Sequence, residues 1–275
     1  MSTSPLPFSP LPVVTGAMQY THGPSSRRAE GVPRGRVVQF DLTDSTVYPG
    51  TTRTVRVFVP AQYDGSEPAA LMVFQDGRLY LDDAEDMRAG TVLENLVHEG
   101  SMPVTVGVFV DPGQPTNRNA EYDPADDRYV TFLLDEVLPA VEQRTGVRFT
   151  DDPARRAICG GSSGGNCAFT AAWHRPDAFG LVLGFVSSFA QIPGGDPYPA
   201  LIRSAEDKPI RVFLEANRFD LRHDQRERNW YSENLLVAAA LAERGYDHRL
   251  VLGDGGHSPN HGGVVLPDAL RWLWR

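Results

Sequence analysis

A short segment near the middle of the chain combines glycines and serines in a pattern that could hold a catalytic nucleophile. The run 157–169 reads Ala-Ile-Cys-Gly-Gly-Ser-Ser-Gly-Gly-Asn-Cys-Ala-Phe, with apolar residues before the glycines and a helical pattern after them. In a nucleophile elbow, a strand ends in a sharp turn, a serine lies at the apex, and a helix begins directly after it. Glycines flank the apex because a Cβ would clash there, and the helix N-terminus offers N–H groups to an oxyanion. The segment therefore predicts a serine nucleophile for acyl transfer.

The elbow pattern fits the sequence in two registers. Gly160-Gly-Ser-Ser-Gly places Ser162 at the apex, whereas Gly161-Ser-Ser-Gly-Gly places Ser163 there. Ser162 is favoured because it directly follows the two glycines that end the expected strand. This register also leaves two glycines together at the start of the helix, where they let it approach the sheet closely. A phosphate-binding loop would need Gly-Lys-Ser/Thr, and no lysine lies nearby.

A serine hydroxyl is a weak nucleophile near neutral pH, so it needs a base and an acidic residue that orients the base. In folds with this elbow, the acid and then a histidine follow the serine along the chain, each just beyond a strand. The apolar run 210–214 leads into a charged loop, and Asp220 is the preferred acid because it lies one loop beyond that strand. Glu215 and Asp224 are the alternatives.

The base is expected after the last apolar strand, at residues 248–252. His257 follows two glycines there, on a loop that can return the imidazole over the edge of the sheet. His261 lies four residues later and is suited to a supporting role. The remaining histidines are expected elsewhere. His22 lies in the N-terminal arm, His98 and His174 end helices, His248 starts a strand, and His223 lies in a loop before the wrong strand.

Two backbone N–H groups are needed to hold the negative charge that develops on the carbonyl oxygen. One is expected from Ser163, the residue after the favoured nucleophile. The other is expected from the turn after the third strand, where Gly77 lets the chain present the backbone N–H of Arg78. Several residues in nearby loops or at a helix start are candidate substrate contacts, and their arginines would suit an anionic acyl or sugar group: Trp230, Tyr231, Arg78, Arg118, Asn119 and Glu121.

The elements that would position these groups alternate between strands and helices. Two β-branched segments, 36–42 and 54–59, predict an antiparallel hairpin. Apolar runs predict buried strands at 69–74, 104–110, 155–159, 181–186, 210–214 and 248–252. Helical spacing predicts helices at 91–98, 128–143, 164–173, 230–244 and 267–274, with a polar loop at 111–127. This order predicts an α/β-hydrolase fold, a mostly parallel sheet flanked by helices without a large lid, as one domain at 35–275 after an extended arm at 1–34.

The composition narrows the function classes. The 275 residues carry a net charge of −9 and no basic cluster, which argues against nucleic-acid binding. The sequence contains no run of 18 apolar residues and no signal-peptide pattern at its start, so we expect a cytoplasmic protein that does not enter membranes. Cys159 and Cys167 flank the elbow and are expected as buried free thiols, with a disulfide as the alternative. A homodimer is the default expectation for the oligomeric state.

Several segments together resemble the enterochelin esterase-like family of α/β-hydrolases, which also holds feruloyl and acetylxylan esterases and mycolyltransferases. These segments are Val73-Phe-Gln-Asp-Gly, Asp135-Glu-Val-Leu-Pro, Ile158-Cys-Gly-Gly-Ser-Ser-Gly-Gly, Phe213 to Asp220, and Gly255-Gly-His with Trp272 downstream. The resemblance implies Ser162 as nucleophile, Asp220 as acid and His257 as base, with the N–H groups of Ser163 and Arg78 around the oxyanion. Ser163 stands where the family usually has a larger residue.

The residues and the resemblance together predict a serine carboxylic-ester hydrolase that works through an acyl-enzyme. Its substrate would be a small-molecule ester of a small acid, a sugar or a siderophore. An acyltransferase that uses the same triad and a non-catalytic ligand-binding member of the family are the alternatives. The complete Ser/His/Asp set argues against the second of these. No metal or organic cofactor is implied.

Overall fold

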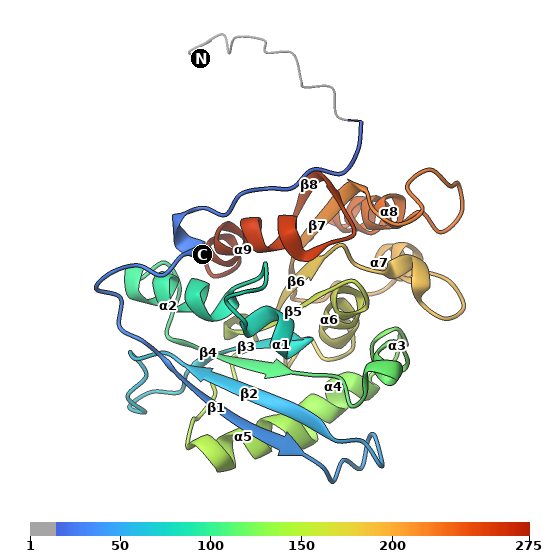
Figure 1. The fold of residues 1–275 in the computed structure, drawn as a ribbon. Helices are drawn as coiled ribbons and strands as arrows, with labels where there is room; N and C mark the ends of the chain where they lie inside the picture. Colours follow the sequence, from blue (N-terminus) through green and yellow to red (C-terminus); the bar gives the residue numbers. More distant parts are fainter. Residues whose placement is uncertain (1–14) are drawn as a thin grey trace.

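The computed structural model describes residues 15–275, in which strands and helices alternate along the chain (Figure 1). The strands are β1 (Arg36–Leu42), β2 (Arg53–Val59), β3 (Ala70–Gln75), β4 (Thr105–Val110), β5 (Arg156–Gly161), β6 (Leu181–Phe185), β7 (Arg211–Phe219) and β8 (His248–Gly256). The α-helices are α1 (Gly77–Leu81), α2 (Ala89–Glu99), α3 (Arg118–Tyr122), α4 (Arg128–Phe132), α5 (Leu138–Thr145), α6 (Ser163–His174), α7 (Tyr198–Ser204), α8 (Trp230–Glu243) and α9 (Pro259–Leu273).

The strands form one sheet in the order β1-β2-β4-β3-β5-β6-β7-β8. β1 pairs antiparallel with β2, and β2 pairs antiparallel with β4. The remaining neighbours are all parallel. The predicted mostly parallel sheet is therefore confirmed, and so is its leading antiparallel hairpin. Parallel strands end at a common edge, which brings the loops after β3, β5, β7 and β8 together.

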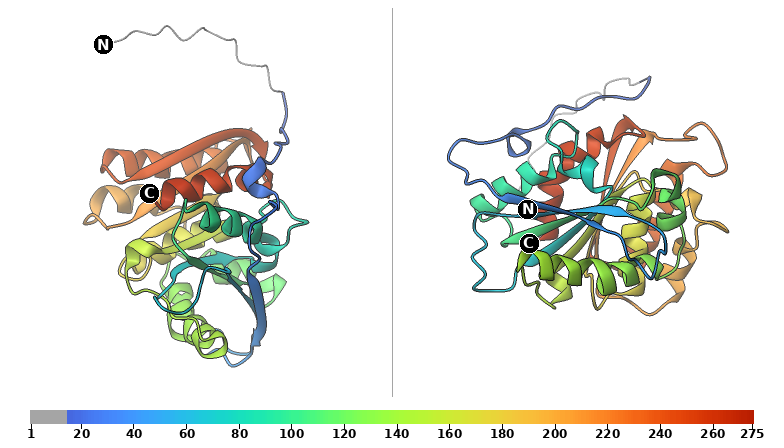
Figure 2. Two further views of the ribbon diagram at one scale, coloured as in Figure 1. Left: turned by 90° about the vertical axis from the view of Figure 1, so that its left-hand side faces the viewer. Right: turned by 60° about the horizontal axis from the view of Figure 1, so that its bottom comes forward.

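Two apolar layers enclose the sheet, one on each face. In β3, Leu71 and Val73 point into one layer while Met72 and Phe74 point into the other. This is the reason for the continuous apolar run in the sequence, because successive side chains of a strand face opposite sides. Helices α4, α5, α6 and α8 contribute to the first layer, and α2 and α9 contribute to the second. Figure 2 shows these helices on the two sides of the twisted sheet.

The structure corrects several predicted boundaries. The expected polar loop at 111–127 contains α3, and α7 was not predicted at all. The last helix begins at Pro259 rather than at Pro267, which lies inside α9. Strands β7 and β8 both run to the rim of the sheet, so Asp220 and His257 follow them directly, without an intervening loop. This extension matters because it fixes both side chains to the ends of rigid strands.

The predicted N-terminal arm crosses the outside of the domain. Within its described part, residues 15–34, the chain passes β8 and α9 and then reaches the region of α2, with a short 3-10 turn at Pro24–Ser26 (Figures 1 and 2). The first part of that predicted arm, residues 1–14, lies outside the described residues. Among the helices at 15–275, none has the length and apolar character required to cross a bilayer.

Candidate active site

Ser162 lies at a sharp turn between β5 and α6. Its backbone has φ 58° and ψ −126°, a conformation that costs energy for a residue with a side chain and is typical of functional turns. The surrounding glycines make this turn possible. A Cβ on Gly160 would lie 2.4 Å from the backbone of Gly164, and one on Gly165 would lie 2.4 Å from Ser187 Oγ. The segment thus has the geometry of a nucleophile elbow with Ser162 at its apex.

The structure brings Ser162, His257 and Asp220 into one hydrogen-bonded chain. The Ser162 hydroxyl lies 3.1 Å from His257 Nε2, and His257 Nδ1 lies 2.6 Å from Asp220 Oδ1. The Asp220 side chain is completely buried, whereas the imidazole remains one-quarter exposed. Asp220 Oδ1 also accepts the backbone N–H of Leu221 at 2.7 Å, which fixes the carboxylate in place. Such a chain can remove the serine proton and stabilise the resulting imidazolium.

The alternative nucleophile, Ser163, faces away from this histidine. Its side chain is buried, and its hydroxyl is 3.2 Å from Asn119 Nδ2 and 3.4 Å from Ser188 Oγ. Ser163 is the first residue of α6, so its backbone N–H has no acceptor within the helix. The position beside the apex is where an oxyanion donor is required. The arrangement therefore favours Ser162 as the nucleophile and leaves the Ser163 amide for the oxyanion.

The alternative acid and the neighbouring histidine form a separate buried pair. His261 Nδ1 lies 2.6 Å from Glu215 Oε1 and 2.9 Å from Asn217 Oδ1. Burial raises the pKa of Glu215, and the hydrogen bond from His261 opposes that change. Asp224, the other alternative for the acid, is exposed. Asp220 is therefore the carboxylate that contacts His257, and the Glu215–His261 pair lies beside the triad rather than in it.

The second predicted oxyanion donor is engaged elsewhere. The backbone N–H of Arg78 donates to Asp111 Oδ1 at 2.8 Å, and Asp111 Oδ2 accepts Arg56 Nη1 at 2.6 Å. Asp76, just before this turn, has the left-handed φ of 54° and places Gly77 at the start of α1. A Cβ on Gly77 would lie 2.5 Å from the Phe109 backbone, so the turn is pressed against β4. The role of Arg78 in oxyanion binding stays a prediction.

Three of the six candidate substrate contacts, Trp230, Arg118 and Glu121, have partners within the protein. Trp230 is buried, and its ring meets the His257 ring edge-on at a centroid distance of 4.7 Å. Arg118 makes two hydrogen bonds of 2.6 Å to Asp76 and one of 3.2 Å to the Gly161 carbonyl. Trp230 therefore supports His257, whereas Arg118 is bonded to Asp76 and also lines a hollow of about 460 Å³ together with Arg78 and Asp111. The role of both residues as substrate contacts stays a prediction.

Glu121 is also engaged within the protein, and its role as a substrate contact stays a prediction. Its side chain is buried and bonds Arg53 Nη1 at 2.7 Å and the Gly113 N–H at 3.0 Å. Glu121 lies in α3, in the segment expected to be a polar loop, and this helix turns its carboxylate inward toward β2. The enclosure of this carboxylate by an arginine and a backbone amide favours a structural role.

A small apolar pocket opens beside Ser162. Its volume is about 140 Å³, and it is lined mainly by apolar residues of α1, the turn before α2, the end of β6 and the start of α9: Leu79, Tyr80, Met87, Phe185, Val186 and Pro259. Val186 has φ 41°, a strained value for a β-branched residue. None of these residues was predicted as a substrate contact. The position of most of them near strand ends was the available signal, but their apolar character resembles that of the core.

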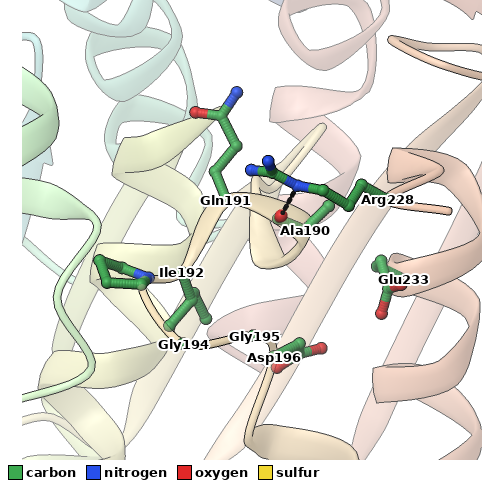
Figure 3. Close-up of a pocket in the computed structure, with 9 residues that line it drawn as sticks. Ala190, Gln191, Ile192, Gly194, Gly195, Asp196, Arg228 and Glu233 are labelled. Carbon is green, nitrogen blue, oxygen red and sulfur yellow. Dashed lines mark hydrogen bonds between the residues drawn. The ribbon is translucent and has the colours of Figure 1, made fainter.

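A larger cavity of about 430 Å³ lies beyond β6 and is formed by residues 190–196 with Arg228 and Glu233 (Figure 3). Arg228 crosses one side and donates to the Ala190 carbonyl at 3.0 Å. Asp196 and Glu233 lie on the other side, and burial raises the pKa of Asp196 to about 7. No triad residue lines this cavity, so its size does not identify it as the site of reaction.

The sequence is similar to that of known esterases. Residues 46–261 match the putative esterase family. An iron(III) enterobactin esterase of Dickeya dadantii is 26% identical over 91% of this chain, and one of Escherichia coli K12 is 32% identical over 45%. The chain spans 59% of the first relative and 30% of the second, so it corresponds to only part of either protein.

Solved structures show the same fold. The ferric enterobactin esterase of Salmonella typhimurium matches with a TM-score of 0.76 at 23% identity, covering 94% of this chain and 61% of that one. A ferulic acid esterase matches with a TM-score of 0.69 at 20% identity, covering 88% of this chain and 99% of that one. These likenesses establish the α/β-hydrolase fold, and the family match covers most of the sequence. The chain therefore belongs to the putative esterase family.

Proposed function

We propose that this protein is a serine carboxylic-ester hydrolase. The observation that carries the proposal is the unbroken chain from the Ser162 hydroxyl through His257 to Asp220, with distances of 3.1 Å and 2.6 Å. A buried carboxylate, an imidazole and a serine on a strained turn have no structural need to meet in this order. Their arrangement matches what an acyl-transfer reaction needs.

In the proposed reaction, the Ser162 oxygen attacks the ester carbonyl while His257 Nε2 takes its proton. Asp220 holds His257 through Nδ1 and stabilises the positive charge that develops on the ring. The Ser163 N–H binds the carbonyl oxygen as it becomes negative. His257 then gives the proton to the leaving alcohol, which leaves an acyl group on Ser162. Water, activated by the same histidine, releases the acid and restores the enzyme.

The pocket beside Ser162 suggests which part of an ester is recognised. A volume of about 140 Å³ with mostly apolar walls suits a short acyl group better than a long chain. We therefore expect kcat/KM for nitrophenyl esters to be highest for acetate to butanoate and to fall for longer chains. Enterobactin and ferulic acid esters, suggested by the names of the relatives, belong in the same substrate screen.

The decisive experiment combines turnover with labelling of the nucleophile. The wild-type protein should hydrolyse nitrophenyl acetate and form a fluorophosphonate adduct at Ser162. Ser162→Ala should lose both, because no other hydroxyl contacts the His257 Nε2 atom in the described residues. Full activity in Ser162→Ala, or a wild-type protein that forms no adduct, would refute the proposal.

We propose the cytoplasm as the location of the protein. Cys159 and Cys167 are both free and buried, so within residues 15–275 no disulfide requires an oxidising compartment. Cell fractionation with an antibody against the protein tests this location. A homodimer stays an expectation from general frequency.

A further inference from the structure

The loop that carries His257 is held from outside the domain by the N-terminal arm. By this loop we mean residues 253–260, which comprise the end of β8, the connection 257–258 and the first residues of α9. Its imidazole must stay 3.1 Å from the Ser162 hydroxyl for the proposed reaction to proceed. Contacts from Asp220 and Trp230 hold the ring, but they do not hold the backbone on either side of it. The backbone before it is paired with β7 as far as Gly256, and further contacts on both sides come from a segment more than 230 residues earlier in the chain.

Arm residues contact the chain on both sides of His257. Before it, the Met18 N–H donates to the Asp254 carbonyl at 2.8 Å, and the Asp254 N–H donates to the Tyr20 hydroxyl at 2.7 Å. After it, Asn260 Oδ1 accepts the Tyr20 N–H at 2.6 Å, and Asn260 Nδ2 donates to the Tyr20 carbonyl at 3.2 Å. Asp254 and Asn260 are three residues before and three residues after His257. We call this set of contacts, from Met18 and Tyr20 to Asp254 and Asn260, the arm clasp.

The ring of Tyr20 extends the clasp into the buried polar pair beside the triad. It stacks on His261 with a centroid distance of 4.4 Å and an angle of 27° between the planes. His261 in turn is hydrogen-bonded to Glu215 and Asn217 on β7, the strand that ends at Asp220. Tyr20 is therefore linked through His261 to β7, the strand that ends at the catalytic acid.

The loop packs closely against the side chains of Asn217 and His261, so it can adopt only one position under the clasp. A Cβ on Gly253 would lie 2.4 Å from the His261 ring, and one on Gly255 would lie 2.9 Å from the Asn217 side chain. Asn217 Nδ2 also donates to the Gly256 carbonyl at 3.0 Å, next to His257. The loop is thus held between β7 below it and the arm above it.

The arm also ties this loop to a wall of the substrate pocket. Asn260 Nδ2 lies 3.1 Å from Asp86 Oδ1, and the His22 ring donates to the Asp86 carbonyl at 2.7 Å. The next residue, Met87, lines the pocket beside Ser162. One short segment of the arm thus contacts both the histidine loop and the turn that shapes the acyl pocket.

We propose that Tyr20 is a positioning residue for the hydrolase reaction, acting through the arm clasp on the loop that carries His257. The proposal rests on the proposed function, because it concerns the geometry of that triad. Without the Tyr20 side chain, the Asp254 N–H loses its acceptor and the His261 ring loses its stacking partner, while the backbone contacts to Asn260 remain. The loop then samples positions in which the imidazole is farther from Ser162. A displacement of about 1 Å can lower a catalytic rate on the order of 10²-fold.

The test compares Tyr20→Ala and Tyr20→Phe with a matched control. Tyr63→Ala is suitable, because Tyr63 is also partly buried and its hydroxyl accepts a backbone N–H, from Arg148 at 2.9 Å. We expect Tyr20→Ala to lower kcat by about tenfold with KM changed by less than about threefold. Tyr20→Phe keeps the stacking on His261 and loses one hydrogen bond, so its kcat should lie between those of Tyr20→Ala and the wild type. Tyr63→Ala should keep the wild-type kcat.

Two further measurements separate positioning from a general loss of structure. Amide hydrogen exchange should accelerate in residues 254–261 of Tyr20→Ala and stay unchanged in β3 and β5. The rate of fluorophosphonate labelling at Ser162 should fall in parallel with kcat. A Tyr20→Ala protein with wild-type kcat, or with a lower kcat but unchanged exchange in residues 254–261, would overturn the proposal. A wild-type protein without labelling would instead refute the hydrolase function itself.

Discussion

The backbone N–H of Arg78 and the carboxylate of Asp111 are joined by a hydrogen bond of 2.8 Å. The second oxygen of the same carboxylate holds Arg56 at 2.6 Å, so Asp111 is fixed between a backbone amide and a guanidinium. The amide is the one predicted to bind the oxyanion together with that of Ser163. An oxyanion would therefore have to compete with a carboxylate for this donor, and the negative charge of Asp111 would oppose its approach.

We expect Asp111→Asn to raise kcat by about twofold to tenfold, a fraction of what a complete oxyanion donor contributes. The amide side chain has the same size, but it carries no charge and competes less strongly for the Arg78 N–H. Steady-state hydrolysis of nitrophenyl acetate measures the effect. A lower kcat in Asp111→Asn would show that the carboxylate orders this turn and that the oxyanion takes its second donor elsewhere.

Alanine substitutions of the two serines in the elbow should have very different effects on kcat. Ser162→Ala should reduce kcat by at least about 10³-fold, because it removes the atom that attacks the ester. Ser163→Ala removes a buried hydroxyl bonded to Asn119 but keeps the backbone N–H, so its kcat should stay within about fivefold of the wild type. Mass spectrometry of the labelled peptide identifies which serine carries the adduct. An inactive Ser163→Ala beside an active Ser162→Ala would reverse the assignment.

Glu121 should matter for stability and not for substrate affinity. Glu121→Ala leaves the buried Arg53 without its partner, and breaking a buried ion pair in this way costs about 3–5 kcal/mol of unfolding free energy. Urea denaturation measures this loss, while KM should be unchanged at a temperature where the variant is folded. The double variant Arg53→Met/Glu121→Leu removes both charges and should recover much of the lost stability. A raised KM in Glu121→Ala would instead support the substrate-binding hypothesis.

Asp196 should give the protein a dependence of stability on pH. Burial raises its pKa in the folded protein to about 7, from 3.8. Between these two pKa values, Asp196 is ionised in the unfolded chain and protonated in the folded protein. The free energy of unfolding therefore falls as the pH rises through this range, and it stays at the lower level above pH 7. Asp196→Asn retains an acceptor for the Tyr198 N–H and carries no charge. We therefore expect it to be more stable than the wild type by about 1–4 kcal/mol at pH 8.

Thermal or urea unfolding at pH 4, 6 and 8 measures this difference. The gain in Asp196→Asn should grow from near zero at pH 4 and level off above pH 7. Asp177→Asn is a suitable control, because Asp177 is exposed and its pKa is lowered by Arg175 instead of raised. A constant difference between Asp196→Asn and the wild type across this range would contradict the prediction.

The sequence was sufficient to predict the triad geometry because each of its signals is local. The elbow pattern depends on adjacent glycines around Ser162, and Asp220 and His257 each lie a few residues beyond a predicted apolar strand, although the structure extends both strands up to them. A parallel sheet then brings such strand ends together without further information. The positions of the buried strands could be predicted as well, since continuous apolar runs are typical of strands buried on both faces.

The partners of charged loop residues could not be predicted. Arg118 pairs with Asp76, 42 positions away, and Glu121 pairs with Arg53, 68 positions away. Which arginine meets which carboxylate depends on the exact course of the loops, and a polar segment looks the same whether it faces solvent or folds inward as α3. The contact of Tyr20 with His261 has the same origin, because nothing in the arm sequence indicates which surface it crosses.

The tight packing at Gly160 and Gly165, where a Cβ would lie 2.4 Å from a neighbouring atom, has a consequence for redesign of this protein. Positions with no room for even one methyl group can accept almost no variation, so a mutant library that includes them would consist mostly of failed folds. Residues that border the acyl pocket, such as Leu79 in α1 and Met87 just before α2, lie outside the elbow. Substrate preference can therefore be diversified there while the reactive serine is left as it is.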